Sequence, residues 1–141
     1  MTTVAADRAQ IAADSKTTSG ETWFHATKLY RIGNAVVGVS GDSTAIEKFL
    51  TWYRGGRKRK RQPEFKDSES FSALILTRAG LYHVDESMGV DLIKDDYFAI
   101  GSGAACALVA MDLGLSPRDA VLAASRRDQH TGGEIEVMGV P

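Results

Sequence analysis

Apolar and polar residues alternate in several short runs of the sequence, with the two-residue period of a strand that has one buried face. Alternating or continuous apolar runs predict strands over residues 2–8, 10–15, 28–32, 35–39, 72–77, 81–84, 97–100 and 134–138. Gly33-Asn34 and Arg78-Ala79-Gly80 lie between successive strands and predict two hairpins. The small polar segment from Thr17 to Gly20 is expected to form a loop.

Three other segments have the apolar spacing of amphipathic helices. The first follows Asp42 or Ser43, which can cap it, and its apolar face consists of Ile46, Phe49, Leu50 and Tyr53. The second opens after Gly103, with a stripe formed by Ala104, Leu108, Met111 and Leu115. The third begins at Ser116-Pro117 and runs to about Arg127. Strands, one helix, strands, two helices and a last strand predict a layered α+β domain.

Composition and charge narrow the class of protein. The 141 residues are 43% apolar and 25% charged, which suits one globular domain over residues 1–141. The net charge of -1 gives no overall attraction to nucleic acid or to an acidic membrane, so neither is an expected partner. Cys106, the only cysteine, is expected to pack inside a helix and suits a cytoplasmic protein. No apolar run approaches the roughly 20 residues of a membrane span.

The residue after the initiator methionine is Thr2. Methionine before a small residue is normally removed during synthesis, so we expect the mature chain to begin at Thr2. Its α-amine would have a reference pKa near 7.7 to 8.0, and a modest downward shift makes it a neutral base at cellular pH. Such an amine can take the hydroxyl proton as the Thr2 oxygen attacks a carbonyl carbon. Many chains begin with Met-Thr, so Thr2 alone does not define an enzyme.

Further polar and glycine residues follow Thr2 in a distinctive order. They are Thr2-Thr3-Val4, Asp14, Lys28, Gly41-Asp42, Gly101-Ser102-Gly103 and Arg127-Asp128-Gln129-His130-Thr131-Gly132-Gly133. With these motifs the sequence resembles the proteasome β-subunit and HslV-type peptidase family of N-terminal nucleophile (Ntn) hydrolases. The resemblance covers two blocks, from Thr2 to about Leu50 and from Ser72 to the C-terminus. It implies a four-layer αββα sandwich of two antiparallel sheets between helices.

The resemblance implies a role for each matching residue of the catalytic centre. Thr2 would be the nucleophile, with its own amine as the base. The ammonium of Lys28 would lower the pKa of that amine and favour the developing alkoxide. Asp14 would pair with the lysine and orient it. Ser102 and Asp128 would form hydrogen bonds around the terminal amine.

The resemblance also implies groups that bind the substrate. The backbone N–H of Gly41 would be the oxyanion donor, a contribution of about 2.7 to 4 kcal/mol to lowering the barrier. Val39, two residues earlier on the same strand, would line the specificity pocket. Thr131, where proteasomal members usually carry serine, is grouped with Val39 as a substrate-binding residue. Taken singly, each candidate also has an ordinary interpretation as a strand residue, a turn former or a helix cap.

Together these assignments predict a threonine endopeptidase that hydrolyses polypeptide substrates through a threonyl ester. It would need no cofactor and no metal, and His25, His83 and His130 have no metal-ligand spacing. We expect a homo-oligomeric ring, with an ATP-dependent unfoldase as a possible partner. Two alternatives remain open: a catalytically inactive structural or binding subunit of the same fold, and an Ntn hydrolase of small amides.

The run from Arg57 to Arg61 consists of five basic residues. Such runs occur at nucleic-acid and other anionic surfaces, but the preferred interpretation is a mobile, solvated loop. A docking surface for an acidic partner is an intermediate possibility. Family members carry a second helix in this region, whereas residues 54–70 lack a helical apolar stripe. Ring size and the docking of an unfoldase therefore stay open.

Overall fold

Strands and helices follow one another largely in the predicted order. The structure is a computed structural model that describes residues 2–141; Met1, whose removal the sequence predicts, lies outside the described residues. The strands are β1 (Thr3–Asp7), β2 (Gln10–Ala13), β3 (Lys16–Ser19), β4 (Thr22–His25), β5 (Leu29–Ile32), β6 (Ala35–Gly41), β7 (Phe71–Thr77), β8 (Gly80–Asp85), β9 (Val90–Leu92), β10 (Tyr97–Gly101) and β11 (Glu136–Gly139). The helices are α1 (Ser43–Arg54), α2 (Ala104–Asp112) and α3 (Pro117–Ser125), with a 3-10 helix over Arg59–Arg61.

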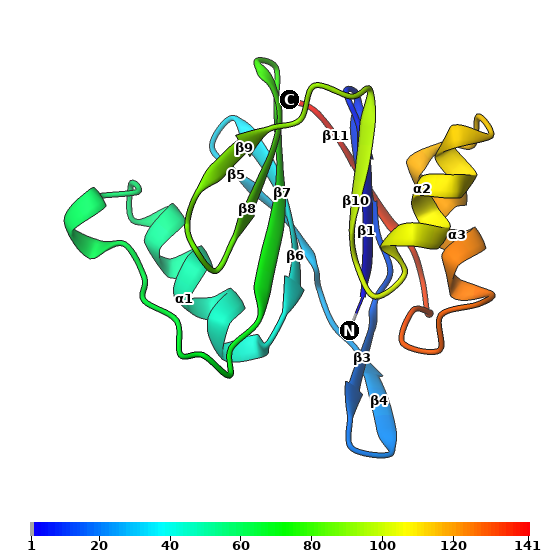
Figure 1. Ribbon diagram of the computed structural model, residues 1–141, viewed down its shortest axis with the longest axis horizontal. Helices are drawn as coiled ribbons and strands as arrows, with labels where there is room; N and C mark the ends of the chain where they lie inside the picture. Colours follow the sequence, from blue (N-terminus) through cyan, green and yellow to red (C-terminus); the bar gives the residue numbers. More distant parts are fainter. Residues whose placement is uncertain (1) are drawn as a thin grey trace.

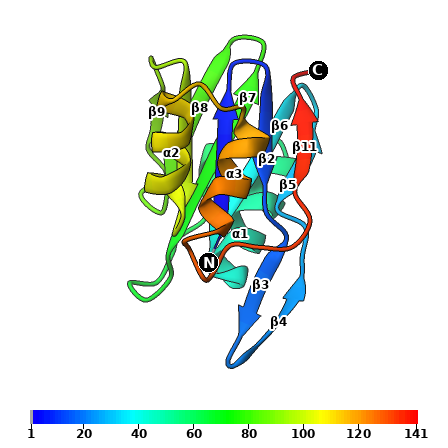
Figure 2. The same ribbon diagram turned by 90° about the vertical axis from the view of Figure 1, so that its right-hand side faces the viewer.

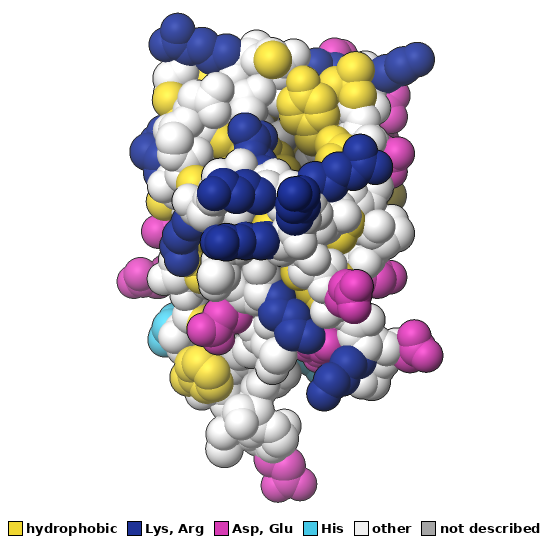
Figure 3. All heavy atoms as spheres, turned by 90° about the vertical axis from the view of Figure 1, so that its left-hand side faces the viewer, with side chains coloured by type: hydrophobic (Ala, Val, Ile, Leu, Met, Phe, Trp, Pro, Cys, Tyr) yellow, Lys and Arg dark blue, Asp and Glu magenta, His cyan; other side chains and the backbone are white. Residues whose placement is uncertain are grey.

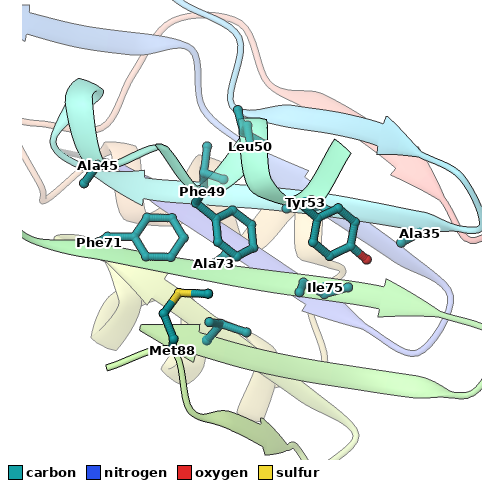
Figure 4. Packing of buried hydrophobic residues seen from close by; sticks show 12 residues of the cluster. Ala35, Ala45, Phe49, Leu50, Tyr53, Phe71, Ala73, Ile75 and Met88 are labelled. Atoms are coloured by element: carbon teal, nitrogen blue, oxygen red, sulfur yellow. The ribbon is translucent and has the colours of Figure 1, made fainter. Parts of the chain in front are cut away.

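One sheet has the strand order β5-β6-β7-β8-β9, and all its neighbouring strands are antiparallel. Helix α1 packs across the outer face of this sheet (Figure 1). Phe49 of α1 is fully buried there beside Phe71 (Figure 4). The centroids of their rings lie 4.7 Å apart. Leu50 and Tyr53 are buried beside it, which confirms three of the four residues of the predicted apolar face of α1. Ile46, the fourth, is only partly buried and packs against the same cluster.

The other large sheet has the order β10-β1-β2-β11 and is also antiparallel. Helices α2 and α3 cover its outer face, with α3 lying over β1 and β2 (Figure 2). Small side chains fill this contact, which lets the helices approach the strands closely. The fully buried alanines of this contact include Ala5, Ala12, Ala107, Ala120 and Ala124.

The two sheets face each other (Figure 1). The aliphatic core between them is formed mainly by Val4, Ile11, Leu29, Val36, Leu74, Leu76 and Leu81. Gly38 of β6 faces β1 and β2 across this core. A Cβ atom at this glycine would come within 2.6 Å of a Val4 methyl group and 2.9 Å of an Ile11 methyl group. This core holds β1 against β6, which fixes the position of Thr2 directly before β1.

The expected loop from Thr17 to Gly20 is wrong for most of its length. Thr17 and Thr18 belong to β3, which pairs with β4 in a separate two-stranded ribbon that extends beyond the sheets (Figure 1). Thr17 pairs with Phe24 and Thr18 with Trp23, so β-branched and aromatic side chains support the ribbon. The turn itself is only Gly20-Glu21. The polar composition of β3 gives no strand signal in the sequence, and β4 and the short strand β9 were also not predicted.

The predicted stripe of α2 is partly wrong. The helix ends at Asp112, so Leu115 lies outside it and is 41% exposed. The buried face of α2 is instead Ala107, Ala110 and Met111. Helix α3 begins as predicted, because the Ser116 hydroxyl accepts a 3.2 Å hydrogen bond from the backbone N–H of Asp119. None of the helices within residues 2–141 is long and apolar enough to cross a membrane.

The basic run is solvated but has local structure. Figure 3 shows Lys and Arg side chains gathered over the outer face that carries α1. The Trp52 indole N–H donates a 2.9 Å hydrogen bond to the carbonyl of Lys58, and the 3-10 helix Arg59–Arg61 follows directly. Over the described part of the chain no α-helix lies between α1 and β7, as expected from residues 54–70.

Candidate active site

A cleft of about 660 Å³ lies where β1 begins, beside the end of β6 and the first turns of α1. Four of the predicted residues line it: Thr2, Lys28, Val39 and Gly41. Its walls combine apolar side chains from β5, β6 and α1 with the threonines of β3. The cleft therefore brings segments that are far apart in sequence to the candidate nucleophile.

Thr2, Asp14 and Lys28 form one buried group. Thr2 is 3% exposed, Asp14 2% and Lys28 8%. The Thr2 hydroxyl donates a hydrogen bond to Asp14 Oδ1, and the Lys28 ammonium donates to the same oxygen at 2.9 Å. The candidate nucleophile and the candidate lysine therefore meet at one carboxylate oxygen, below the surface of the protein.

Backbone groups hold the Asp14 carboxylate in place. Its Oδ1 also accepts the N–H of Thr3 at 3.0 Å, while Oδ2 accepts the N–H of Gly132 at 3.0 Å and of Lys16 at 3.3 Å. These donors come from β1, from β3 and from the loop before β11, and they satisfy a buried anion that would otherwise be costly. Asp14 is thus fixed by three separate segments of the chain.

The Lys28 ammonium is anchored by two oxygens. Besides Asp14 it donates to the backbone carbonyl of Lys16 at 2.5 Å. Burial lowers the pKa of the Lys28 side chain from its ordinary value, and the Asp14 carboxylate opposes that shift by stabilising the charged form. The ammonium is therefore held near the Thr2 hydroxyl, which bonds to the same oxygen of Asp14.

The turn after β10 encloses the backbone of Thr2. Gly101 pairs with Thr3 in the sheet and has a φ of +96°. A Cβ atom at Gly101 would lie 1.9 Å from the Thr2 carbonyl oxygen. A Cβ atom at Gly103 would lie 2.0 Å from the Thr3 hydroxyl oxygen. Both glycines of the Gly-Ser-Gly motif are therefore needed to pack this turn against Thr2 and Thr3.

Ser102, Asp128 and Thr131 form a second polar network beside Thr2. The Ser102 hydroxyl lies 3.4 Å from the Thr2 carbonyl oxygen and donates to Asp128 Oδ2 at 2.5 Å. The Thr131 hydroxyl donates to the same Oδ2 at 2.6 Å. Burial raises the pKa of Asp128, but the hydrogen bonds from Ser102 and Thr131 outweigh it and leave the pKa below its ordinary value.

Of the remaining candidates, Gly41 and Val39 line the cleft, whereas Thr131 lies outside it. Gly41 ends β6 with a φ of +127°, and a Cβ atom there would lie 2.2 Å from the carbonyl oxygen of Ser70. Val39 is 1% exposed and lines the cleft. Thr131 does not line this cleft; it is buried beside Asp128 and Thr3. Its role in binding substrate stays a prediction.

Sequence reasoning missed three contributors to the site. Thr3 bonds both to Asp14 and to Thr131, Lys16 supplies a carbonyl to Lys28, and Gly132 supplies an N–H to Asp14. Two of these act through the backbone, which leaves no side-chain pattern in the sequence. The pair Thr2-Thr3 could have indicated Thr3, because two successive polar residues at the start of a buried strand must both find hydrogen-bond partners.

Neither a protein-family model nor a curated protein matches the sequence. Solved structures do match. Eukaryotic HslV from Trypanosoma brucei is similar over 97% of this chain and 98% of that chain, with 20% identity and a TM-score of 0.76. Thiobacillus denitrificans BPH is similar over 99% and 98%, with 21% identity and a TM-score of 0.72. The same protein in complex with epoxomicin covers equal shares, with 22% identity and a TM-score of 0.71.

At these identities the likeness defines the fold. The chain has the α+β fold of the HslV and proteasome β type, which is an N-terminal nucleophile hydrolase fold. The predicted α+β fold class of the Ntn-hydrolase type is therefore confirmed.

Proposed function

We propose that the protein is a threonine peptidase that hydrolyses peptide bonds with Thr2 as its N-terminal nucleophile. One observation carries the proposal: the Thr2 hydroxyl and the Lys28 ammonium share the buried oxygen Oδ1 of Asp14 at the head of a cleft. The likeness in fold to HslV and to epoxomicin-bound BPH supports the same reaction class.

Removal of Met1 converts the Thr2 amide nitrogen into an α-amine. In the proposed reaction this amine takes the proton from the Thr2 hydroxyl as its oxygen bonds to the scissile carbonyl carbon. The amine then returns the proton to the leaving nitrogen, and the C–N bond breaks to give a threonyl ester. Water attacks the ester with the same amine as base, releasing the acid product and the free hydroxyl.

Lys28 and Asp14 act on the charge of this reaction. The Lys28 ammonium favours the neutral form of the nearby amine and stabilises the developing negative charge on the Thr2 oxygen. Asp14 keeps the buried lysine charged and oriented. Ser102, whose hydroxyl lies 3.4 Å from the Thr2 carbonyl oxygen, and its partner Asp128 would bind the terminal amine. No cofactor or metal takes part in these steps.

The cleft would hold the substrate beside Thr2. The backbone N–H of Gly41 is the proposed donor to the oxyanion. The absence of a side chain lets Gly41 pack against the Ser70 carbonyl at the wall of the cleft. Val39 would contact the side chain next to the scissile bond. Thr131 supports the amine-binding side of the site through Asp128 and is retained as a secondary substrate-binding candidate.

The likeness in fold to HslV also supports proposals about the domain, its assembly, its location and its partner. We propose one domain over residues 1–141 with the four-layer αββα sandwich of the Ntn class. Copies of it would form a homo-oligomeric ring in the cytoplasm that acts on polypeptides, and an ATP-dependent unfoldase would be the partner. An inactive subunit and a small-amide hydrolase are the alternatives that the experiment must separate.

The test compares the wild-type chain with Thr2→Ala on fluorogenic peptides and on small amides. The proposal expects hydrolysis of peptides by the wild type and complete loss in Thr2→Ala with an unchanged circular dichroism spectrum. Hydrolysis confined to small amides would favour the amidase. Equal turnover by both proteins, or turnover by neither, would refute the assignment of Thr2 as the nucleophile.

A further inference from the structure

Thr3 is a fully buried polar residue that the proposed reaction leaves unused. It is 0% exposed and begins β1, directly after the candidate nucleophile. Successive side chains of a strand point to opposite sides. Thr2 therefore faces the cleft, whereas the hydroxyl of Thr3 lies 2.7 Å from that of Thr131, toward α2 and α3.

The direction of the hydrogen bonds in this network follows from counting protons. A hydroxyl has one proton to donate, and a carboxylate can only accept. Thr131 donates its proton to Asp128 Oδ2 at 2.6 Å. Thr3 must therefore be the donor in its 2.7 Å contact with Thr131. The chain of bonds runs in one direction, from Thr3 through Thr131 to the Asp128 carboxylate.

Counting protons in the same way shows which hydrogen bonds Ser102 can make. Its proton goes to Asp128 at 2.5 Å, since a short bond to an anion is much stronger than one at 3.4 Å to the Thr2 carbonyl. The oxygen of Ser102 then presents lone pairs beside the backbone of Thr2. Such an oxygen can accept a hydrogen bond from a terminal amine but cannot donate one.

Thr3 also contacts the other network of the site. Its backbone N–H donates to Asp14 Oδ1 at 3.0 Å, the oxygen that Thr2 and Lys28 share. Among the described residues Thr3 thus bonds to both carboxylate networks, to Asp14 directly and to Asp128 through Thr131. Its side chain is enclosed by Gly103, where a Cβ atom would lie 2.0 Å from the Thr3 oxygen.

We infer that Thr3 is a positioning residue whose hydroxyl orders Thr131 and Asp128, and so presents Ser102 as an acceptor to the Thr2 amine. This inference rests on the proposed function. Without the Thr3 donor, the Thr131 oxygen loses a partner and delivers a weaker hydrogen bond to Asp128. More negative charge then remains on Asp128 to favour the ammonium form of the Thr2 amine.

Other charged groups surround the same space and set the background for any pH measurement. Asp14, directly after β2, bonds to the Thr2 hydroxyl, and Lys28, directly before β5, bonds to Asp14. His130 adjoins Asp128 in the loop after α3. Lys16 reaches the same loop, where its ammonium donates to the Gln129 carbonyl. A side-chain change at Thr3 replaces none of these groups and keeps the backbone N–H that binds Asp14, so they are common to all variants.

The matched pair for the test is Thr3→Ser and Thr3→Ala, which differ only in the hydroxyl oxygen. With fluorogenic peptide substrate we expect Thr3→Ala to have a kcat about tenfold below that of Thr3→Ser. The acidic limb of its pH–rate profile should move up by about 0.5–1 unit, with Thr3→Ser near the wild type. Thr77→Ser and Thr77→Ala, at the distant β7–β8 hairpin, are the control pair and should behave alike.

A second readout does not need activity. In a carbon-13 NMR titration of the Asp128 carboxyl group, Thr3→Ala should raise the pKa of Asp128, and Thr3→Ser should restore it. Thr3→Val keeps the branched shape of Thr3 without its hydroxyl donor and should give a like shift, so it serves if Thr3→Ala does not fold. An unchanged Asp128 pKa in the folded variants without the Thr3 hydroxyl, or equal pH profiles of Thr3→Ala and Thr3→Ser, would overturn the inference. An inactive wild type would refute the proposed function but not the link from Thr3 through Thr131 to Asp128, because the Asp128 titration tests that link without activity.

Discussion

The Lys28 ammonium lies 2.9 Å from the Asp14 carboxylate, and both side chains are withdrawn from solvent. A buried ion pair gains little over an apolar pair, but loss of one partner leaves an uncompensated charge inside the protein. The pair therefore makes both the stability and the proposed chemistry depend on Asp14.

Asp14→Asn tests this dependence. The variant should lose about 3–5 kcal/mol of unfolding free energy in urea denaturation, because Lys28 keeps its burial without its anion. Peptide hydrolysis should be abolished as well. Asp119→Asn breaks the exposed Arg118–Asp119 pair and should change stability far less. Equal stabilities of the two variants would contradict the structural role given to Asp14.

Gly101 and Gly114 provide a test of the turn that encloses Thr2. Their φ angles are nearly equal, +96° and +94°, but a Cβ atom meets the Thr2 carbonyl at Gly101 and open space at Gly114. Gly114→Ala should cost about 1–2 kcal/mol from backbone strain alone. Gly101→Ala should cost clearly more and should displace Thr2, with loss of activity. Thermal unfolding of both variants measures the difference, and equal losses would contradict the close packing.

Much of this site could be predicted from the sequence because the candidates carry side-chain chemistry in a fixed order. Thr2, Asp14 and Lys28 are polar residues at strand ends, and the structure brings them together. The contributions of Lys16 and Gly132 could not be predicted, since backbone atoms make the bonds. The ribbon of β3 and β4 was concealed because both of its faces are largely exposed, so no apolar alternation marks it.

The pH dependence of stability should report on Asp128. Its pKa is lowered in the folded protein, so its contribution is complete above the ordinary value of 3.8 and is lost as the pH falls through the folded value. The gap in unfolding free energy between the wild type and Asp128→Asn should therefore narrow as the pH is lowered from about 5. Denaturant unfolding over this range measures it. A gap that widens toward low pH would show the opposite sign of the shift.

Two valines of β6, Val39 and Val36, allow substrate specificity and stability to be tested separately. Val39 lines the cleft, whereas Val36 faces the core between the sheets, and both are buried. Val39→Ala should enlarge the cleft and raise the relative kcat/KM for peptides with bulkier apolar side chains by about tenfold or more. Val36→Ala should lower stability without changing that ratio. A substrate profile that responds equally to the two changes would remove Val39 from the specificity pocket.

Mass spectrometry after treatment with a threonine-reactive epoxyketone tests the central claim most directly. We expect an intact mass that lacks one methionine, followed by a single adduct on the N-terminal peptide that begins with Thr2. Retention of Met1, or an adduct elsewhere with the N-terminal peptide unmodified, would contradict it.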